Sequence, residues 1–168
     1  MNSNSKKSFS QFLRVAQQAA LASGQVIREQ FSKPFALEAK SDSDFTVEVD
    51  NLSENAIIEI LRQHFPGHSI FSEEAGQLFG DKSFLWMVDP LDGTNNFVCG
   101  IPYCGVALSL LIDGIVSVAV VYQPFLDRLY WATVGLGAFC NGKRFHRESA
   151  CHGTRNRAER TGANGSVS

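Results

Sequence analysis

An apolar segment that ends in two carboxylates around a proline constrains this chain more than any other feature. Trp86–Val88 is typical of a buried strand, and Asp89-Pro90-Leu91-Asp92-Gly93-Thr94 follows it directly. Carboxylates at the exit of a buried strand are costly to desolvate unless a cation compensates them. Proline sets φ for a turn, glycine lets the backbone approach a ligand, and hard oxygen donors favour Mg²⁺ over Zn²⁺. The alternative is an ordinary strand-to-helix turn, in which Asp92 caps the helix and Asp89 accepts backbone N–H bonds.

Two further segments end in acidic residues in a similar way. Ser69–Phe71 is a short apolar strand candidate that leads into Glu73 and Glu74. Apolar and polar residues alternate over Asp44–Asp50, as expected of a half-buried strand that closes on Asp50. Acids also gather at element ends for capping and solubility, but three such ends close together in the chain predict a divalent-metal site.

The order of these segments resembles the inositol monophosphatase family, a superfamily of Mg²⁺-dependent, lithium-sensitive phosphatases. The resemblance is carried by Glu73-Glu74 and by the run Asp-Pro-Leu-Asp-Gly-Thr-Asn-Asn-Phe at 89–97. It extends over about residues 9–145, and its other matching segments are Gly100–Tyr103, Val106–Leu110, Val120–Pro124 and Gly135–Gly142.

The resemblance implies a set of metal ligands. Glu73 and Asp89 would bind one Mg²⁺ together with the backbone carbonyl of Leu91, and Asp89 and Asp92 would bind a second. Two cations about 3.5–4 Å apart can stabilise both the attacking and the leaving oxygen of an in-line displacement. Glu74 is a weaker candidate for a contact outside this ligand set.

The resemblance also implies a catalytic and a substrate-binding set. The Thr94 hydroxyl, paired with Asp50, would orient and deprotonate the attacking water, and Glu73 would belong to the same catalytic group. The amides of Gly93 and Thr94, with Asp92, would face the substrate phosphate. The implied activity is hydrolysis of inositol monophosphate or a related small phosphate ester, which needs positioning and charge stabilisation rather than a nucleophilic Ser or Cys.

Hydrophobic periodicity predicts two helices in the first part of the chain. Phe9 to about Phe31 carries one apolar face, and Gly24 weakens this helix locally. Asn51 to about Phe65 forms the second, with Asp50 or the residue after it as the N-cap. Between them, Lys40–Asp44 is predicted to be a polar loop.

The later part of the chain has the pattern of a meander of strands. Asp113-Gly114 and Asn141-Gly142 are strong hairpin turns. They join or precede predicted strands at Val106–Ile112, Ile115–Tyr122, Leu129–Thr133 and Lys143–Phe145. The predicted class is therefore α+β, a helix pair plus a mostly antiparallel sheet, which resembles the first half of the family's layered α/β sandwich.

The C-terminal part departs from the family. We expect a disordered N-terminus over 1–8, a family-like domain over 9–145, and a disordered basic tail outside the family pattern over 146–168. Residues 1–140 carry a net charge of −6 and residues 141–168 carry +4. Family members continue into a second half that supplies another metal-binding aspartate in a Trp-Asp element. Here the last aspartate is Asp127, so we expect a C-terminally truncated member.

Truncation leaves an alternative function open. Without its second half, the chain would expose an apolar face of the sheet, which favours partner capture or incomplete folding. The alternative is thus a catalytically inactive homologue that serves as a binding or regulatory module, or a decayed gene product. A homodimer remains compatible with the family resemblance.

Composition sets the remaining bounds. The chain has no apolar run of membrane-spanning length and no apolar leader, so we expect a cytoplasmic protein without a membrane partner. The basic tail lacks interleaved aromatic residues, which argues against a nucleic-acid partner. The four cysteines and four histidines show no zinc-ligand spacing and are expected to be core thiols and surface or turn residues.

Overall fold

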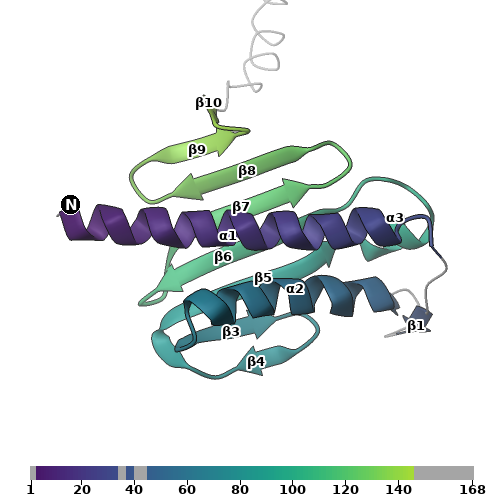
Figure 1. Cartoon of the computed structure of the whole chain (residues 1–168), viewed down its shortest axis with the longest axis horizontal. Coiled ribbons are helices and arrows are strands. Elements are labelled where there is room, and N and C mark those ends of the chain that lie inside the picture. Colours follow the sequence, from purple (N-terminus) through teal and green to yellow (C-terminus); the bar gives the residue numbers. More distant parts are fainter. Residues whose placement is uncertain (1–2, 34–36, 40–44, 146–168) are drawn as a thin grey trace, which may run out of the picture.

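An eight-stranded sheet with two long helices on one face forms the body of the protein (Figure 1). The computed structural model describes residues 3–33, 37–39 and 45–145. The strand order is β10-β9-β8-β7-β6-β5-β3-β4, and every pair is antiparallel except β3 with β5. The strands are β3 (His68–Ser72), β4 (Gly76–Leu78), β5 (Asp81–Asp92), β6 (Gly105–Ile112), β7 (Ile115–Gln123), β8 (Arg128–Thr133), β9 (Gly137–Cys140) and β10 (Lys143–Phe145). This arrangement confirms the predicted α+β class.

The two long helices, α1 (Ser3–Gln30) and α2 (Glu48–His64), lie side by side on the sheet. The α1 helix covers β6 and β7, and α2 covers β5 (Figure 1). A side chain at Gly24 would overlap the ring of Tyr122, which is itself fully buried on β7. Gly24 therefore lets α1 approach the sheet closely, and this packing explains a residue that helix propensity alone disfavours.

Both helices begin earlier than the sequence predicts. The α1 helix begins at Ser3, six residues before Phe9, so the predicted disordered N-terminus is wrong from Ser3 onward. Ser3–Ser8 contains no proline or glycine, and extending an existing helix costs little. The other boundary errors lie around Asp50. The strand predicted up to Asp50 ends at Val47, as β2 (Phe45–Val47), and pairs with β1 (Leu37–Ala39) in a separate sheet.

Asp50 therefore lies in the first turn of α2 and not at a strand end. Acidic residues in a first helical turn complement the helix dipole, and Val49 and Asp50 both turn into the protein interior. The predicted loop at 40–44 and the predicted tail at 146–168 lie outside the described residues.

The two predicted hairpin turns are confirmed. Asp113 and Gly114 have φ of 51° and 78°, and Asn141 and Gly142 have φ of 47° and 77°. Two successive positive φ values are the requirement of a type I′ turn, whose twist matches that of the flanking strands. These turns fix the register of β6 against β7 and of β9 against β10.

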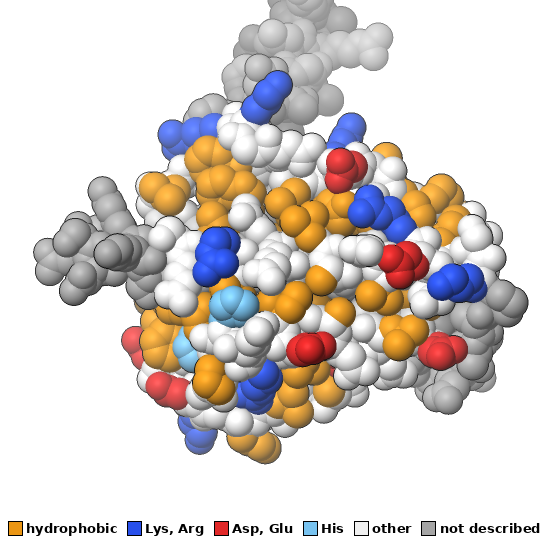
Figure 2. All heavy atoms as spheres, viewed as in Figure 1, with side chains coloured by type: hydrophobic (Ala, Val, Ile, Leu, Met, Phe, Trp, Pro, Cys, Tyr) orange, Lys and Arg blue, Asp and Glu red, His pale blue; other side chains and the backbone are white. Residues whose placement is uncertain are grey.

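The two faces of the sheet differ sharply in exposure. On the helix-bearing face, Trp86 is fully buried and Val120 is 1% exposed. On the opposite face, the exposed fractions of Phe71, Met87 and Val121 are 45%, 43% and 41%. Figure 2 shows the helix-bearing side, where acidic and basic side chains are interspersed. The opposite face is therefore an open apolar surface.

Candidate active site

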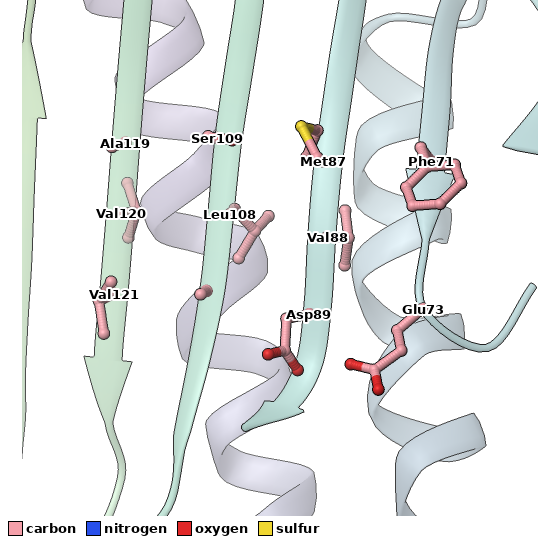
Figure 3. A pocket seen from close by; sticks show the side chains of 11 residues that line it. Phe71, Glu73, Met87, Val88, Asp89, Leu108, Ser109, Ala119, Val120 and Val121 are labelled. Atoms are coloured by element: carbon pink, nitrogen blue, oxygen red, sulfur yellow. The ribbon is translucent and has the colours of Figure 1, made fainter. Parts of the chain in front are cut away.

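Two acidic segments meet because β3 and β5 are parallel neighbours. Ser72 pairs with Val88, and the Glu73 amide continues the ladder by donating to the Val88 carbonyl at 3.2 Å. Parallel strands end at the same edge of a sheet, so Glu73 comes to lie beside Asp89. Figure 3 shows both carboxylates at the same end of a pocket that extends over the sheet from β3 to β7.

A β-bulge shapes the next part of the site. Asp89 pairs with Ala107 and Asp92 pairs with Gly105, so β5 carries one extra residue between these pairs. Pro90 lies within the bulge, where it has no N–H to donate to β6. The buried Ser23 hydroxyl on α1 donates to the Pro90 carbonyl at 3.2 Å. The first helix thereby holds the bulge in place.

A short helix, α3 (Thr94–Val98), follows the bulge. Gly93 precedes it with φ of 91°, and a side chain there would approach the Tyr103 carbonyl to 3.2 Å. The Thr94 hydroxyl lies 3.0 Å from the Leu91 carbonyl and 3.3 Å from Asp50 Oδ1. Because a hydroxyl has one proton, it donates fully to only one of these acceptors at a time. Thr94 therefore links the bulge to α2.

The predicted site residues line one pocket of about 230 Å³, with the exception of Asp50. The pocket is lined by Glu73, Asp89, Leu91, Asp92, Gly93, Thr94, Asn95 and Asn96. Asp50 does not line the pocket, and its link to the site is the contact with the Thr94 hydroxyl. Glu74 is not among the lining residues. In the described ranges, no three His, Cys, Asp or Glu side chains form a compact ligand cluster. A cation here would therefore also need backbone and water oxygens.

The electrostatics of the pocket centre on Asp89. Its Oδ1 atom is buried and has no hydrogen-bond partner among the described residues. Burial, and then the negative charges of Glu73 and Asp92, raise the pKa of Asp89 to about 6, against the smaller opposing effect of the Leu91 amide. Carboxylates that repel one another around an unpartnered oxygen are stabilised by a hard cation, and the carboxylate and carbonyl donors suit Mg²⁺.

The thiol of Cys104 is not a candidate metal ligand. Cys104 is 7% exposed, and burial together with the charge of Asp92 raises its pKa to about 11. It therefore stays a neutral thiol, which is a poor metal ligand.

A larger pocket of about 520 Å³ adjoins the acidic one on the open face of the sheet (Figure 3). Glu73 and Asp89 line both pockets, and the rest of the larger one is mainly apolar. The sequence analysis expected an exposed apolar face of the sheet, but not that Glu73 and Asp89 would line a pocket on it. It also missed two buried polar residues that hold the site, Ser23 and Glu54. Glu54 had a detectable signal, since it follows Asp50 by four residues on the same helical face.

Comparison with known proteins gives consistent matches. A family model described as the inositol monophosphatase family matches residues 8–165. A fructose-1,6-bisphosphatase/inositol-1-monophosphatase from Aquifex aeolicus is 42% identical over 135 residues, which are 79% of this chain and 51% of the relative. The Nus factor SuhB of Escherichia coli is 40% identical over 141 residues, which are 82% of this chain and 53% of the relative.

Solved structures agree with these relatives. The extragenic suppressor protein suhB from Bartonella henselae matches with a TM-score of 0.81 and 30% identity, over 82% of this chain and 55% of that one. An inositol monophosphatase from Anabaena matches with a TM-score of 0.71 and 38% identity, over 83% and 50%. The chain spans about half the length of the curated relatives it matches. In the part of the chain that the structure describes, no helix is long and apolar enough to span a membrane.

Proposed function

Because the chain belongs to the inositol monophosphatase family, we propose that it carries the metal- and phosphate-binding residues of a Mg²⁺-dependent phosphomonoesterase. One observation supports this most strongly: Asp89 places a buried carboxylate oxygen, without a hydrogen-bond partner in the described part of the chain, in a pocket that also holds Glu73 and Asp92. The proposed substrate class is inositol monophosphate or a related small phosphate ester.

Four residues would hold the metal ions: Glu73, Asp89, Asp92 and, through its carbonyl, Leu91. When bound, Mg²⁺ would neutralise charge on the phosphate and lower the pKa of a coordinated water. The chain's own contribution is to keep these oxygens together despite their mutual repulsion. The parallel β3–β5 pair and the bulge at Pro90 do this.

Asp50 and Thr94 would take up the proton that the attacking water loses. The Thr94 Oγ1 atom can orient a water molecule while Asp50 Oδ1, 3.3 Å away, accepts the proton that Thr94 passes on. The amides of Gly93 and Thr94, with Asp92, would position the phosphate. Position 93 favours glycine, because φ there is 91° and a side chain would crowd the Tyr103 carbonyl. Lithium inhibition, a homodimer and a cytoplasmic location belong to the same proposal.

A phosphatase assay with inositol 1-phosphate and Mg²⁺ tests the proposal. We expect turnover by the chain, loss of it in Asp92→Asn, and no change in Asp113→Asn. The second variant makes the same chemical change in an exposed turn that also accepts asparagine. Equal activity in all three proteins would point to a contaminant and count against the proposed residues.

The open apolar face supports a second candidate, a binding module without turnover. Phe71 and Met87 are each more than 40% exposed there, and monomeric proteins rarely leave such residues together. The Escherichia coli relative carries the name Nus factor SuhB and not the name of a phosphatase. A folded chain without activity that forms a stable complex through this face would favour this candidate over the enzyme.

A further inference from the structure

The interior face of α2 carries two acidic residues near its start, where apolar ones are expected. Asp50 is 2% exposed and Glu54, one helical turn later, is 4% exposed, before the face continues with Ile57 and Leu61. Acidic side chains are almost never this buried unless they are paired. The contact with the Thr94 hydroxyl explains why Asp50 can be buried. Glu54 requires a separate explanation.

Glu54 bonds to the turn that follows β3. The Ala75 amide donates to Glu54 Oε1 at 2.8 Å. Ala75 lies in the turn between β3 and β4, two residues after Glu73. A hydrogen bond to an ionised carboxylate is shorter and about twice as strong as one between neutral groups. The bond therefore ties this turn to α2.

Strand pairing holds both ends of the turn, since Ser72 pairs with Gly76 across it. Its first residue, Glu73, is held to β5 by the bond from its amide to the Val88 carbonyl. Glu73 and Ala75 are both exposed, so little buried apolar surface fixes the turn. Besides this strand pairing, the turn is tied to β5 at the Glu73 amide and to α2 at the Ala75 amide, and the Glu73 side chain extends towards Asp89 (Figure 3).

We propose that Glu54 is a positioning residue, which fixes the Glu73–Ala75 turn so that the Glu73 carboxylate faces Asp89. Glu54 itself is not among the residues that line the acidic pocket, so its effect passes through the backbone of the turn. This inference rests on the proposed metal-binding function. It assigns to a residue of α2 the role of fixing the position of a metal ligand, without contact with the metal or the substrate.

Two substitutions separate geometry from charge. Glu54→Ala removes the acceptor of the Ala75 amide, whereas Glu54→Gln removes the charge and keeps an oxygen that can accept the bond. With Mn²⁺ as the probe, measured by electron paramagnetic resonance, we expect Glu54→Ala to weaken binding at least about tenfold. We expect Glu54→Gln to stay within about threefold of the unchanged chain, because it retains the hydrogen bond at reduced strength.

Two matched controls lie on the same helix. Glu59→Ala removes an exposed acid from α2 and should leave Mn²⁺ affinity unchanged. Ile57→Val removes a methyl group from the buried face of α2 and keeps the acceptor of the Ala75 amide, so it reports the effect of reduced stability alone. Circular dichroism on each variant checks that it folds.

Hydrogen exchange at Ala75 provides a readout that needs no metal. In the metal-free chain, the Ala75 amide should exchange faster in Glu54→Ala than in Glu54→Gln or Ile57→Val. Equal Mn²⁺ affinity in Glu54→Ala and the unchanged chain would overturn the inference, and so would equal weakening by the Ala and Gln variants. An unchanged, folded chain that binds no Mn²⁺ would instead overturn the proposed function, and Ala75 exchange would then decide on Glu54 alone.

Discussion

Replacing Asp89 with asparagine should stabilise the metal-free protein while it destroys the proposed metal site. The cause is that burial and the charges of Glu73 and Asp92 raise the pKa of Asp89 from 3.8 to about 6. Above pH 6 the native state therefore holds an ionised carboxylate in an unfavourable environment. Asparagine has nearly the same shape and removes that charge.

The size of the effect follows from the pKa change. A rise from 3.8 to about 6 corresponds to about 3 kcal/mol, and solvent screening of a partly exposed carboxylate reduces this to about 1–2 kcal/mol. The native state binds more protons than the unfolded state between these two pH values. The stability of the unchanged chain should thus fall as pH rises through this window and level off above pH 6.

Urea unfolding, followed by tryptophan fluorescence, measures this directly. In EDTA at pH 7.5, Asp89→Asn should be more stable by about 1–2 kcal/mol, and the difference should vanish near pH 4. Saturating Mg²⁺ should reverse the order, since a ligand at about a hundred times its Kd adds about 2.7 kcal/mol to the unchanged chain alone. A variant that is less stable than the unchanged chain in EDTA at pH 7.5 would refute the reasoning.

Three further changes test the packing and the pH response. Gly24→Ala should destabilise the protein by about 1–3 kcal/mol despite alanine's better helix propensity, because its methyl group would overlap Tyr122; thermal unfolding measures this. Gly93→Ala should cost about 1–2 kcal/mol, because φ there is 91°, and it should also weaken phosphate binding in calorimetry. Trp86 donates to His68 Nδ1 at 3.1 Å, and burial lowers the pKa of His68. The stability of the protein should therefore fall as pH drops below about 6.5, because the unfolded state binds a proton more readily. In His68→Phe, the urea midpoint should no longer show this decrease with falling pH.

The local parts of the fold could be predicted from the sequence. The turns at Asp113-Gly114 and Asn141-Gly142 have a chemistry that needs no distant partner, and both are confirmed. The long apolar face of α1 is likewise local. The start of α2 was missed because alternation up to Val49 suits a strand as well as a first helical turn, and only packing against the sheet decides between them.

The site depended on information that local patterns do not carry. The acidic strand ends predicted a shared metal site, but the parallel pairing of β3 with β5 that brings Glu73 beside Asp89 was not predicted. The bond between Glu54 and Ala75 joins residues 21 apart and had no local signal beyond helical spacing from Asp50. The apolar groove beside the site depends on which sheet face the helices cover, and this is a tertiary property.

Calorimetric titration of the metal-free chain with Mg²⁺ tests the central claim most directly. We expect saturable binding at pH 7.5 that is lost in Asp89→Asn and retained in Asp113→Asn, with both variants folded by circular dichroism. A well-folded chain that takes up no Mg²⁺, or one whose binding survives Asp89→Asn, would contradict the claim that these acidic segments converge to hold a divalent cation.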